Sequence, residues 1–484
     1  METVAELLGP NAGRVSLITT SFPLDDVGYR QEEYVLAGQA TAYEPAGSAD
    51  ADGRWSVRES RSAPFRTRIV VYRPSDPDRF TGTVLVEWLN VSSGADVAAE
   101  WLTTHRHLVR EGFAWVGVSA QREGVDGQGT FSLARNGTGA DSGWSPMLPP
   151  LKQTDPDRYG ELDHPGDPFA FDVFTSAGRA VRDGLFPGAR VLAAGASQSA
   201  SYLVTYVNAV APRSGVFDGY LIHGRPGNPA SLTGWDGVRS GAVRIRTDGP
   251  APVLVLQTET DVVGVLQSAG SRQPDADRFR LWEIAGAAHA DTYTIRAAFG
   301  DSGALGAAEL AALLAPTRNP FGPEFAAPIN SGPQHHYVAQ AAVAALDRWV
   351  RSGTAPAVAP RLTLRAADSD GADRAHPLEL DAAGLARGGV RTPWVDVPTA
   401  VLSGLGQEAS GGGAVLFGST WPFAADVLAA RYPGGHDEYL AAFARSTREA
   451  IDRGFLLAED EDEIVAVAAA SYPGDRAGGG AARA

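Results

Sequence analysis

One short stretch constrains the fold of this chain more than any other, because a strand pattern changes into a helix pattern at a single serine. Residues 190–196 are an apolar run typical of a buried strand. Apolar residues then recur with helical spacing until Pro212, at Leu203, Val204, Val207 and Val210. The turn between the two patterns falls at Ser197.

A turn this sharp holds its central residue in a strained backbone conformation and presses the strand against the helix. The residues two before and two after it must therefore be small, and Gly195 and Ser199 meet that demand. The geometry predicts that the Ser197 hydroxyl projects from the carboxyl end of the strand, with the Gln198 amide facing the position of a developing oxyanion. Gly-x-Ser-x-Ser also arises by chance in a chain rich in Gly, Ala and Ser, but the flanking strand and helix favour a nucleophile turn.

Strand and helix patterns alternate through most of the chain, which indicates an α/β fold with a mostly parallel central sheet flanked by helices. Strands are expected at residues 82–90, 113–119, 190–196, 217–224, 251–257 and 278–284. Helices are expected near residues 97–111, 169–183 and 337–350. Two β-rich runs, 33–38 and 65–72, come before these elements and are typical of antiparallel entry strands.

Three stretches of this predicted core lack periodicity, near residues 121–167, 225–250 and 290–333. A long stretch without pattern inside a regular α/β domain is more typical of a functional lid than of a linker. We therefore expect lid insertions at these places.

A Pro/Ala segment at residues 354–360 is the expected boundary between a core of residues 1–353 and a C-terminal extension of residues 354–484, packed on the core. Within the extension, the sequence predicts a β-like piece at 394–397 and helices near 423–430 and 436–452. The Gly-rich end, from about residue 474, is predicted to be disordered.

Composition excludes several classes of function. The 484-residue chain carries a formal charge of −16, which repels phosphate backbones and argues against a nucleic-acid partner. It has no cysteine, and so no disulfide, thiolate nucleophile or zinc–thiolate site. The N-terminal residues lack a signal-peptide pattern, and no run approaches the apolar length of a membrane span. We expect a cytoplasmic protein without a membrane partner, whose oligomeric state the sequence leaves open.

A serine hydroxyl becomes a useful nucleophile when a histidine takes its proton and a carboxylate holds that histidine in one tautomer. The turn at Ser197 resembles the nucleophile turn of α/β-hydrolases, and this resemblance implies the chain order serine, acid, histidine. The loop after the last core strand carries His289, which we interpret as the base. The loop after the strand ending at residue 257 offers Glu259 and Asp261; its position favours Asp261 as the acid, with Glu259 as an alternative or as a residue that orients the loop.

The second oxyanion donor is expected in the turn after the strand ending at Asn90, from the amide of Asn90 or Val91. Four other histidines are interpreted as structural: His164, His223, His335 and His336. The run 368–371 resembles part of a calcium loop but lacks the remaining ligands, so neither a metal nor a cofactor is predicted.

Several motifs together resemble one family. They are residues 85–92 (LVEWLNVS), 118–121 (VSAQ), 195–199 (GASQS), 257–261 (QTETD), 285–291 (AGAAHAD) and 389–394 (GVRTPW). This set, which spans nearly the whole chain, is similar to the large bacterial and fungal alpha/beta hydrolase domain-containing family. The resemblance implies an α/β-hydrolase fold with a Ser-His-acid hydrolase site, and it implies that the C-terminal part belongs to the same compact unit. It does not specify the substrate.

These observations predict a carboxylic-ester hydrolase that works through an acyl-enzyme at Ser197. A lactonase, amidase or acyltransferase would use the same residues, and a hydrolase-like ligand receptor without turnover is the alternative of a different class. Gln121 and Trp144 are predicted to contact substrate. The proposed lids carry apolar side chains that either pack the loops onto the core or roof the pocket, and as a roof they favour an uncharged, bulky ester over an anionic one: Phe131, Trp144, Met147, Leu148, Tyr159, Trp235 and Phe321.

Overall fold

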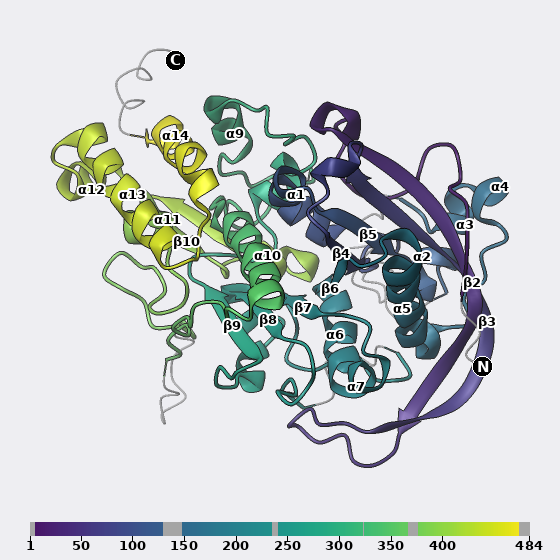
Figure 1. Ribbon diagram of the computed structural model, residues 1–484. Helices are drawn as coiled ribbons and strands as arrows, with labels where there is room; N and C mark the ends of the chain where they lie inside the picture. The colour runs from purple at the N-terminus through teal and green to yellow at the C-terminus, as the bar shows by residue number, and fades with distance from the viewer. Residues whose placement is uncertain (1–4, 129–147, 235–240, 323, 366–375, 474–484) are drawn as a thin grey trace. The chain divides into compact units, whose positions relative to one another are not determined.

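The computed structural model describes residues 5–128, 148–234, 241–322, 324–365 and 376–473 (Figure 1). The chain divides into two compact units. The first comprises Met1–Val255, Leu266–Arg280 and Val343–Ala355, and the second comprises Leu256–Val265, Leu281–Ala342 and Pro356–Ala484. The predicted boundary at residue 354 lies just before Pro356, where the chain enters the second unit again. Residues 281–342, which were predicted to be part of the core, belong to the second unit.

The first unit is built on a large sheet. Its strands are β1 (Glu6–Leu8), β2 (Tyr29–Pro45), β3 (Val57–Pro74), β4 (Thr83–Trp88), β5 (Ala114–Val118), β6 (Arg190–Ala196) and β7 (Gly219–His223). The beginnings of β8 (Val253–Thr258) and β9 (Phe279–Ile284) extend it, which gives the order β1-β2-β3-β5-β4-β6-β7-β8-β9. The six core strands therefore form where the apolar runs predict them.

The sheet is parallel where the strand–helix alternation predicts it. β4 pairs in parallel with both β5 and β6, and β6 pairs in parallel with β7. β2 and β3 form a long antiparallel ribbon that joins the sheet through β3 and β5 (purple in Figure 1). The two predicted entry strands lie within this ribbon.

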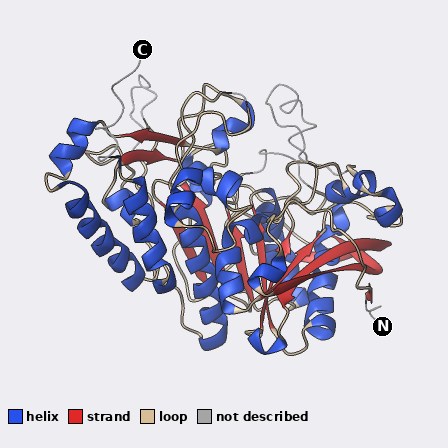
Figure 2. Cartoon of the chain, turned by 90° about the horizontal axis from the view of Figure 1, so that it is seen from above, coloured by secondary structure: helices blue, strands red, loops and turns tan. Residues whose placement is uncertain are grey.

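Helices connect these strands. The longer connecting helices are α1 (Ala99–Glu111), α5 (Ala170–Arg179) and α6 (Gln198–Thr205), drawn with the others in blue in Figure 2. A further long helix, α10 (Gln334–Ser352), follows β9, and only its part from Val343 belongs to the first unit. Because parallel connections are right-handed, α1 covers one face of the sheet and α5 and α6 cover the other. Shorter helical segments are η1 (Leu24–Val27), η2 (Pro77–Arg79), α2 (Arg122–Asp126), α3 (Leu151–Thr154), α4 (Pro156–Tyr159), η3 (Asp167–Phe169), η4 (Ala180–Leu185), η5 (Tyr206–Val210), α7 (Ala211–Ser214) and η6 (Ser268–Ser271).

Aromatic packing fixes α5 and α6 against β4. The ring of Trp88, at the end of β4, lies 4.8 Å from that of Phe174 and 5.3 Å from that of Tyr202. All three side chains are buried, and burying side chains of this size stabilises a fold by about 1.5–3 kcal/mol each. The packing holds the start of α6 at the carboxyl edge of the sheet.

The second unit contains the end of β8 followed by α8 (Glu259–Val263), and a two-stranded sheet of β10 (Ala400–Ser403) and β11 (Ser419–Pro422), which Figure 2 shows as a separate pair. Its other helical segments are η7 (Tyr293–Ala297), α9 (Ala307–Leu313), α11 (Pro393–Asp396), η8 (Gly412–Leu416), α12 (Ala425–Arg431), α13 (Gly435–Asp452), η9 (Ala458–Asp460) and α14 (Glu461–Ser471). The two helices predicted in the C-terminal part are confirmed as α12 and α13.

One local prediction is wrong. Residues 394–397 do not form a β-like piece, because Pro393 starts the helical turn α11 after the extended Thr392. The segments 121–167 and 290–333 lack periodicity in the sequence, yet both contain short helices: α2, α3 and α4 in the first, and η7 and α9 in the second. Residues 129–147 of the first segment, residues 235–240, the run 368–371 and the tail from residue 474 lie outside the described residues.

Among the described residues, no helix combines the length and the apolar character that crossing a bilayer requires.

Candidate active site

Ser197 occupies a strained turn between β6 and α6, in the first unit. Its φ and ψ are 60° and −118°, a conformation that residues other than glycine rarely adopt. The Ser197 amide donates to the carbonyl of His223 at the end of β7, 2.9 Å away. The backbone is therefore fixed from the neighbouring strand, and the side chain remains partly exposed at the carboxyl edge of the sheet.

The small residues on either side of Ser197 have distinct roles. A Cβ atom on Gly195 would lie 3.2 Å from the backbone carbon and oxygen of Ser199, closer than most real Cβ contacts. Ser199 replaces the glycine that is usual after such a serine. Its Oγ donates to the Ala196 carbonyl (2.8 Å) and accepts from the Ala196 amide (3.0 Å), so this serine closes the turn by hydrogen bonding.

The turn after β4 lies against the nucleophile turn. Asn90 Nδ2 donates to the carbonyl of Ala196 at 2.9 Å. The Asn90 amide donates to Val97 O, which occupies it and removes it as an oxyanion donor. The Val91 amide has no acceptor among the described residues, and the Gln198 amide is the first of α6 and has no partner within that helix. The two remaining candidates are thus Val91 and Gln198.

Among the residues predicted to contact substrate or to roof the pocket, Gln121 and Tyr159 belong to the described part of the first unit. The Gln121 side chain is buried, and its Oε1 accepts from Trp88 Nε1 at 3.1 Å. Tyr159 is buried in a small cluster with Val125 and Leu151, and its hydroxyl donates to Glu33. It therefore packs its segment onto the fold. Trp144 lies outside the described residues.

Of the remaining apolar residues predicted in the lids, the structure describes two, Phe321 and Leu148. Phe321, in the second unit, is 40% exposed and has its ring edge-on to Phe417 at 5.5 Å. Leu148 lies at the edge of the described part of its segment. Three further positions lie outside the described residues: Phe131, Met147 and Trp235.

A buried pair of carboxyl groups, Glu87 and Glu100, lies between β4 and the start of α1. Glu87, in β4, accepts from the amides of Glu100 (2.9 Å) and Trp101 (3.0 Å) at the start of α1 and from Trp115 Nε1 (2.8 Å). Burial and the like charge of Glu100 raise the pKa of Glu87 to about 8, although these donors oppose the shift.

The pair connects to the nucleophile through one histidine. Glu100 Oε1 lies 3.1 Å from Nδ1 of His223, whose carbonyl holds the Ser197 amide. His223 was expected to have a structural role. Its side chain contacts Glu100, and its carbonyl accepts from the Ser197 amide. Sequence reasoning missed Glu87 and Glu100; the available signal was a charged residue inside the apolar run 82–90.

In the second unit, His289 and Asp261 are brought together. His289 Nδ1 lies 2.6 Å from Asp261 Oδ1, and the second carboxylate oxygen accepts from the Thr258 amide at 2.6 Å. Asp261 is fully buried, whereas the His289 side chain is 13% exposed. Burial alone would raise the pKa of Asp261, but the charge and hydrogen bonds of His289 and Thr258 hold it below its ordinary value.

Glu259 is turned away from this pair and holds two loops. Its carboxylate accepts from the amides of Gly286 (2.6 Å) and Gly404 (2.8 Å) and from the Ser403 hydroxyl (3.3 Å). Burial raises its pKa to about 7, against the effect of the Gly404 and Gly286 donors. Gly286 belongs to the loop that leads to His289, so Glu259 orients that loop.

The same loop is held from a third side. Asn330 Nδ2 and Gln334 Nε2 both donate to the carbonyl of Gly286, at 2.9 Å and 2.6 Å. His289 itself is tied down through its amide, which donates to the Thr260 hydroxyl (3.2 Å). The imidazole is thus carried on a segment with little freedom to move.

Within the described ranges, no group of three or more His, Asp or Glu side chains could hold a metal ion. The other histidines have local partners: His164 Nε2 lies 2.8 Å from the Ala120 carbonyl, and the ring of His336 stacks on that of Tyr293 at 3.5 Å. His335 Nδ1 lies 3.5 Å from Asp291.

A parallel sheet with a strained serine between strand and helix, together with a His–Asp pair after later strands, defines the class of α/β-hydrolases. The chain belongs to the alpha/beta hydrolase domain family, whose pattern matches residues 5–466. The resemblance seen in the sequence motifs is confirmed. Comparison with curated protein sequences found no match.

Solved structures that resemble the chain are distant in sequence. An a/b serine hydrolase without a lid from Xanthomonas campestris shares 14% identity over 50% of this chain and 83% of its own, with a TM-score of 0.26. An alpha-beta serine hydrolase homologue from Coxiella burnetii shares 14% identity over 46% and 84%, with a TM-score of 0.25. A fungal esterase from Rhizomucor miehei shares 12% over 51% and 74%, with a TM-score of 0.24.

Proposed function

We propose that this hydrolase cleaves carboxylic esters through an acyl-enzyme, with Ser197 as nucleophile, His289 as general base and Asp261 as the acid that orients it. The observation that carries the proposal is the pairing of two geometries that serine catalysis needs: a strained, partly exposed serine at a strand–helix turn, and a buried aspartate 2.6 Å from a histidine. The approach of His289 to Ser197 is part of the proposal.

In the proposed reaction, Ser197 Oγ attacks the ester carbonyl while His289 Nε2 takes its proton. Asp261 stabilises the imidazolium that forms, because its carboxylate already faces Nδ1. The Gln198 and Val91 amides donate to the oxyanion. His289 then protonates the leaving alkoxide, and a water molecule, activated by the same histidine, releases the acid from Ser197.

Asp261 is favoured over Glu259 because the carboxylate of Glu259 is occupied by Gly286, Gly404 and Ser403. A lactonase, amidase or acyltransferase would use the same three residues and differ in the acceptor that the pocket admits. A receptor without turnover is the rival of another class, and it would have no need of a strained serine or of a paired histidine.

Short p-nitrophenyl esters and a fluorophosphonate label test the proposal. Wild-type protein should hydrolyse the esters and take up one label, and Ser197→Ala should lose both. Ser201→Ala, a buried serine one turn further along α6, is the matched control and should keep both. Turnover that survives in a folded Ser197→Ala protein would refute the nucleophile, and absence of turnover and labelling in the wild type would favour the receptor.

A further inference from the structure

The second unit contains a cavity of about 370 Å³ that shares no lining residue with the proposed catalytic set. The cavity, called here the Trp394 cavity, lies among α9, α11, α13, α14, β10 and β11. Its main lining residues are Leu314, Pro333, Trp394, Leu402, Pro422 and Val467. A volume of this size falls in the range of small-molecule sites, which begins at about 300 Å³.

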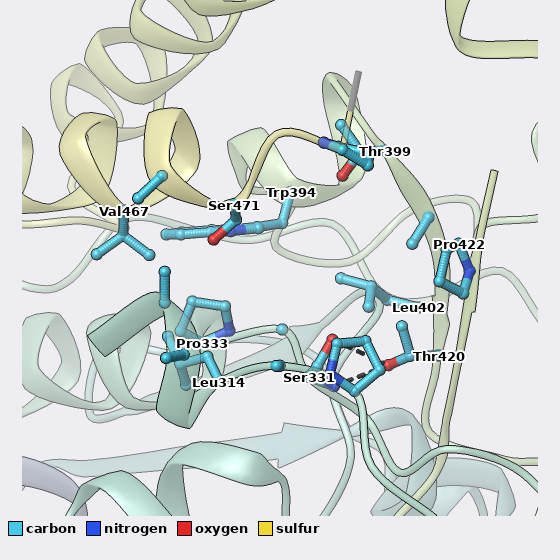
Figure 3. Close-up of a pocket in the computed structure, with 18 of the residues that line it drawn as sticks. Leu314, Ser331, Pro333, Trp394, Thr399, Leu402, Thr420, Pro422, Val467 and Ser471 are labelled. Carbon is cyan, nitrogen blue, oxygen red and sulfur yellow. Dashed lines mark hydrogen bonds between the residues drawn. The ribbon is translucent and has the colours of Figure 1, made fainter. Parts of the chain in front are cut away.

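Neighbouring aromatic rings hold the Trp394 wall of the cavity in place. Figure 3 shows Trp394, Ser471 and Val467 on one side, facing Leu314 and Pro333. The Trp394 ring stacks on that of Tyr337 at 5.6 Å and 9°, and it meets the edge of Phe443 at 5.3 Å. Because neighbouring rings and α-helices hold the indole in place, Trp394 forms an aromatic wall of the cavity.

No charged residue lines the Trp394 cavity among the residues that the structure describes, although the whole chain carries a charge of −16. A charged ligand would lose its hydration without gaining a partner of opposite sign, which is costly. The lining therefore selects for an uncharged and mainly apolar molecule.

Hydroxyl groups add a small polar component. Thr420 Oγ1 is used within the protein, since it accepts from the Ser331 amide (2.8 Å) and donates to the Ile329 carbonyl (2.9 Å). Thr399 and Ser471 also line the cavity, and within the described part of the chain neither hydroxyl has a hydrogen-bond partner. They are available to a ligand that carries a hydroxyl or a carbonyl oxygen.

We propose that the Trp394 cavity is a second binding site, for an uncharged, mainly apolar small molecule with one alcohol or carbonyl oxygen. The chain itself offers another occupant, because residues 474–484 follow directly on Pro473, which lines the cavity. That segment carries Asp475, Arg476 and Arg483, and these charges do not suit an uncharged cavity.

Fluorescence titration of the full chain with N-phenyl-1-naphthylamine, an uncharged aromatic probe, tests the proposal. The Ser197→Ala protein is used as the parent, so that binding is separated from turnover. Two variants fill the cavity, Thr399→Trp and Ser471→Trp; because Ser471 is exposed, the second should fold even if the first does not. Each should weaken probe binding at least about tenfold, whereas Thr354→Trp, at an exposed position in the first unit, should leave it unchanged.

Three outcomes would overturn the proposal. The first is probe affinity that is the same in the parent and in folded cavity-filling variants. The second is tighter binding of the anionic probe 8-anilinonaphthalene-1-sulfonate than of the neutral one at the Ser471-sensitive site. The third is a gain of at least about tenfold in affinity when residues 474–484 are deleted, which would identify the tail as the natural occupant. A decanol-dependent loss of bound probe in the parent, absent from Ser471→Trp, would support the alcohol-binding component.

Discussion

The hydroxyl of Ser199 bonds both backbone polar groups of Ala196, at 2.8 Å to the carbonyl and 3.0 Å from the amide. Ser199→Ala should therefore lower the free energy of unfolding by about 1–3 kcal/mol, because the part-buried Ala196 amide loses its partner, whereas the Ala196 carbonyl keeps the bond from Asn90 Nδ2. Urea unfolding measures the change. Ser201→Ala, whose hydroxyl has no partner within the described residues, is the control and should change stability much less. Equal effects in the two variants would contradict a closing role for Ser199.

The two acids should differ in what their loss affects. Asp261→Asn should lower kcat/KM by about 10³–10⁴-fold, because an amide cannot accept from both His289 and Thr258 or stabilise the imidazolium. Glu259→Gln should mainly lower stability, by about 1–3 kcal/mol, since its amide cannot serve every donor around it. Steady-state kinetics and urea unfolding on both proteins separate these effects. An inactive but stable Glu259→Gln protein beside an active Asp261→Asn protein would reverse the assignment.

Stability should depend on the Glu87–Glu100 pair in a defined pH window. The pKa of Glu87 rises from 4.5 in the unfolded chain to about 8 in the folded protein. The contribution of this group is fully present below the unfolded pKa and is lost as pH rises towards the folded value, at up to about 1.4 kcal/mol per pH unit, because only the unfolded chain releases the proton.

Glu87→Gln should flatten this pH dependence, since the amide does not ionise. The substitution also removes a hydrogen bond, which lowers the free energy of unfolding equally at every pH. The slope of the free energy of unfolding against pH is therefore the quantity to compare. Glu44→Gln, at an exposed carboxylate, should leave the slope unchanged. Parallel curves for wild type and Glu87→Gln would show that Glu87 stays ionised in the folded protein.

The preferred substrate should be an uncharged, fairly bulky ester. Neutral aryl and alkyl esters should be hydrolysed with higher kcat/KM than carboxylate-bearing esters, because the net negative chain disfavours anions. Trp144→Ala should raise KM for the bulky neutral esters if this residue contacts them. Preference for anionic esters, or unchanged kinetics in a folded Trp144→Ala protein, would refute the prediction.

The sequence predicted most of the sheet because its strands are apolar runs with turn residues between them, as in β4 and β6. It also predicted the pairing of His289 with a carboxylate, since both follow strands whose carboxyl ends share an edge. It could not choose firmly between Asp261 and Glu259. Two residues of separation turn their side chains in different directions, and only the helix start at Thr258 decides which one meets the histidine.

Other features depend on contacts remote in sequence. Glu100 meets His223 across 123 positions. Residues 394–397 appeared β-like because three of their four side chains are apolar, yet the proline before them starts a helical turn. The Trp394 cavity is assembled from six separate elements, and no local pattern marks it.

Asp261 belongs to the capping box of α8 and also faces His289. One oxygen of this side chain thus serves folding, and the other serves the proposed catalysis. Both neighbours donate, so no uncharged isostere satisfies both, and every substitution at position 261 should combine a structural loss with the proposed catalytic one. The two roles can be separated at Thr258. Thr258→Val removes the other half of the capping box and leaves the Asp261 carboxylate in place, so the effect of the cap on the position of His289 can be measured without removing the charge beside the histidine.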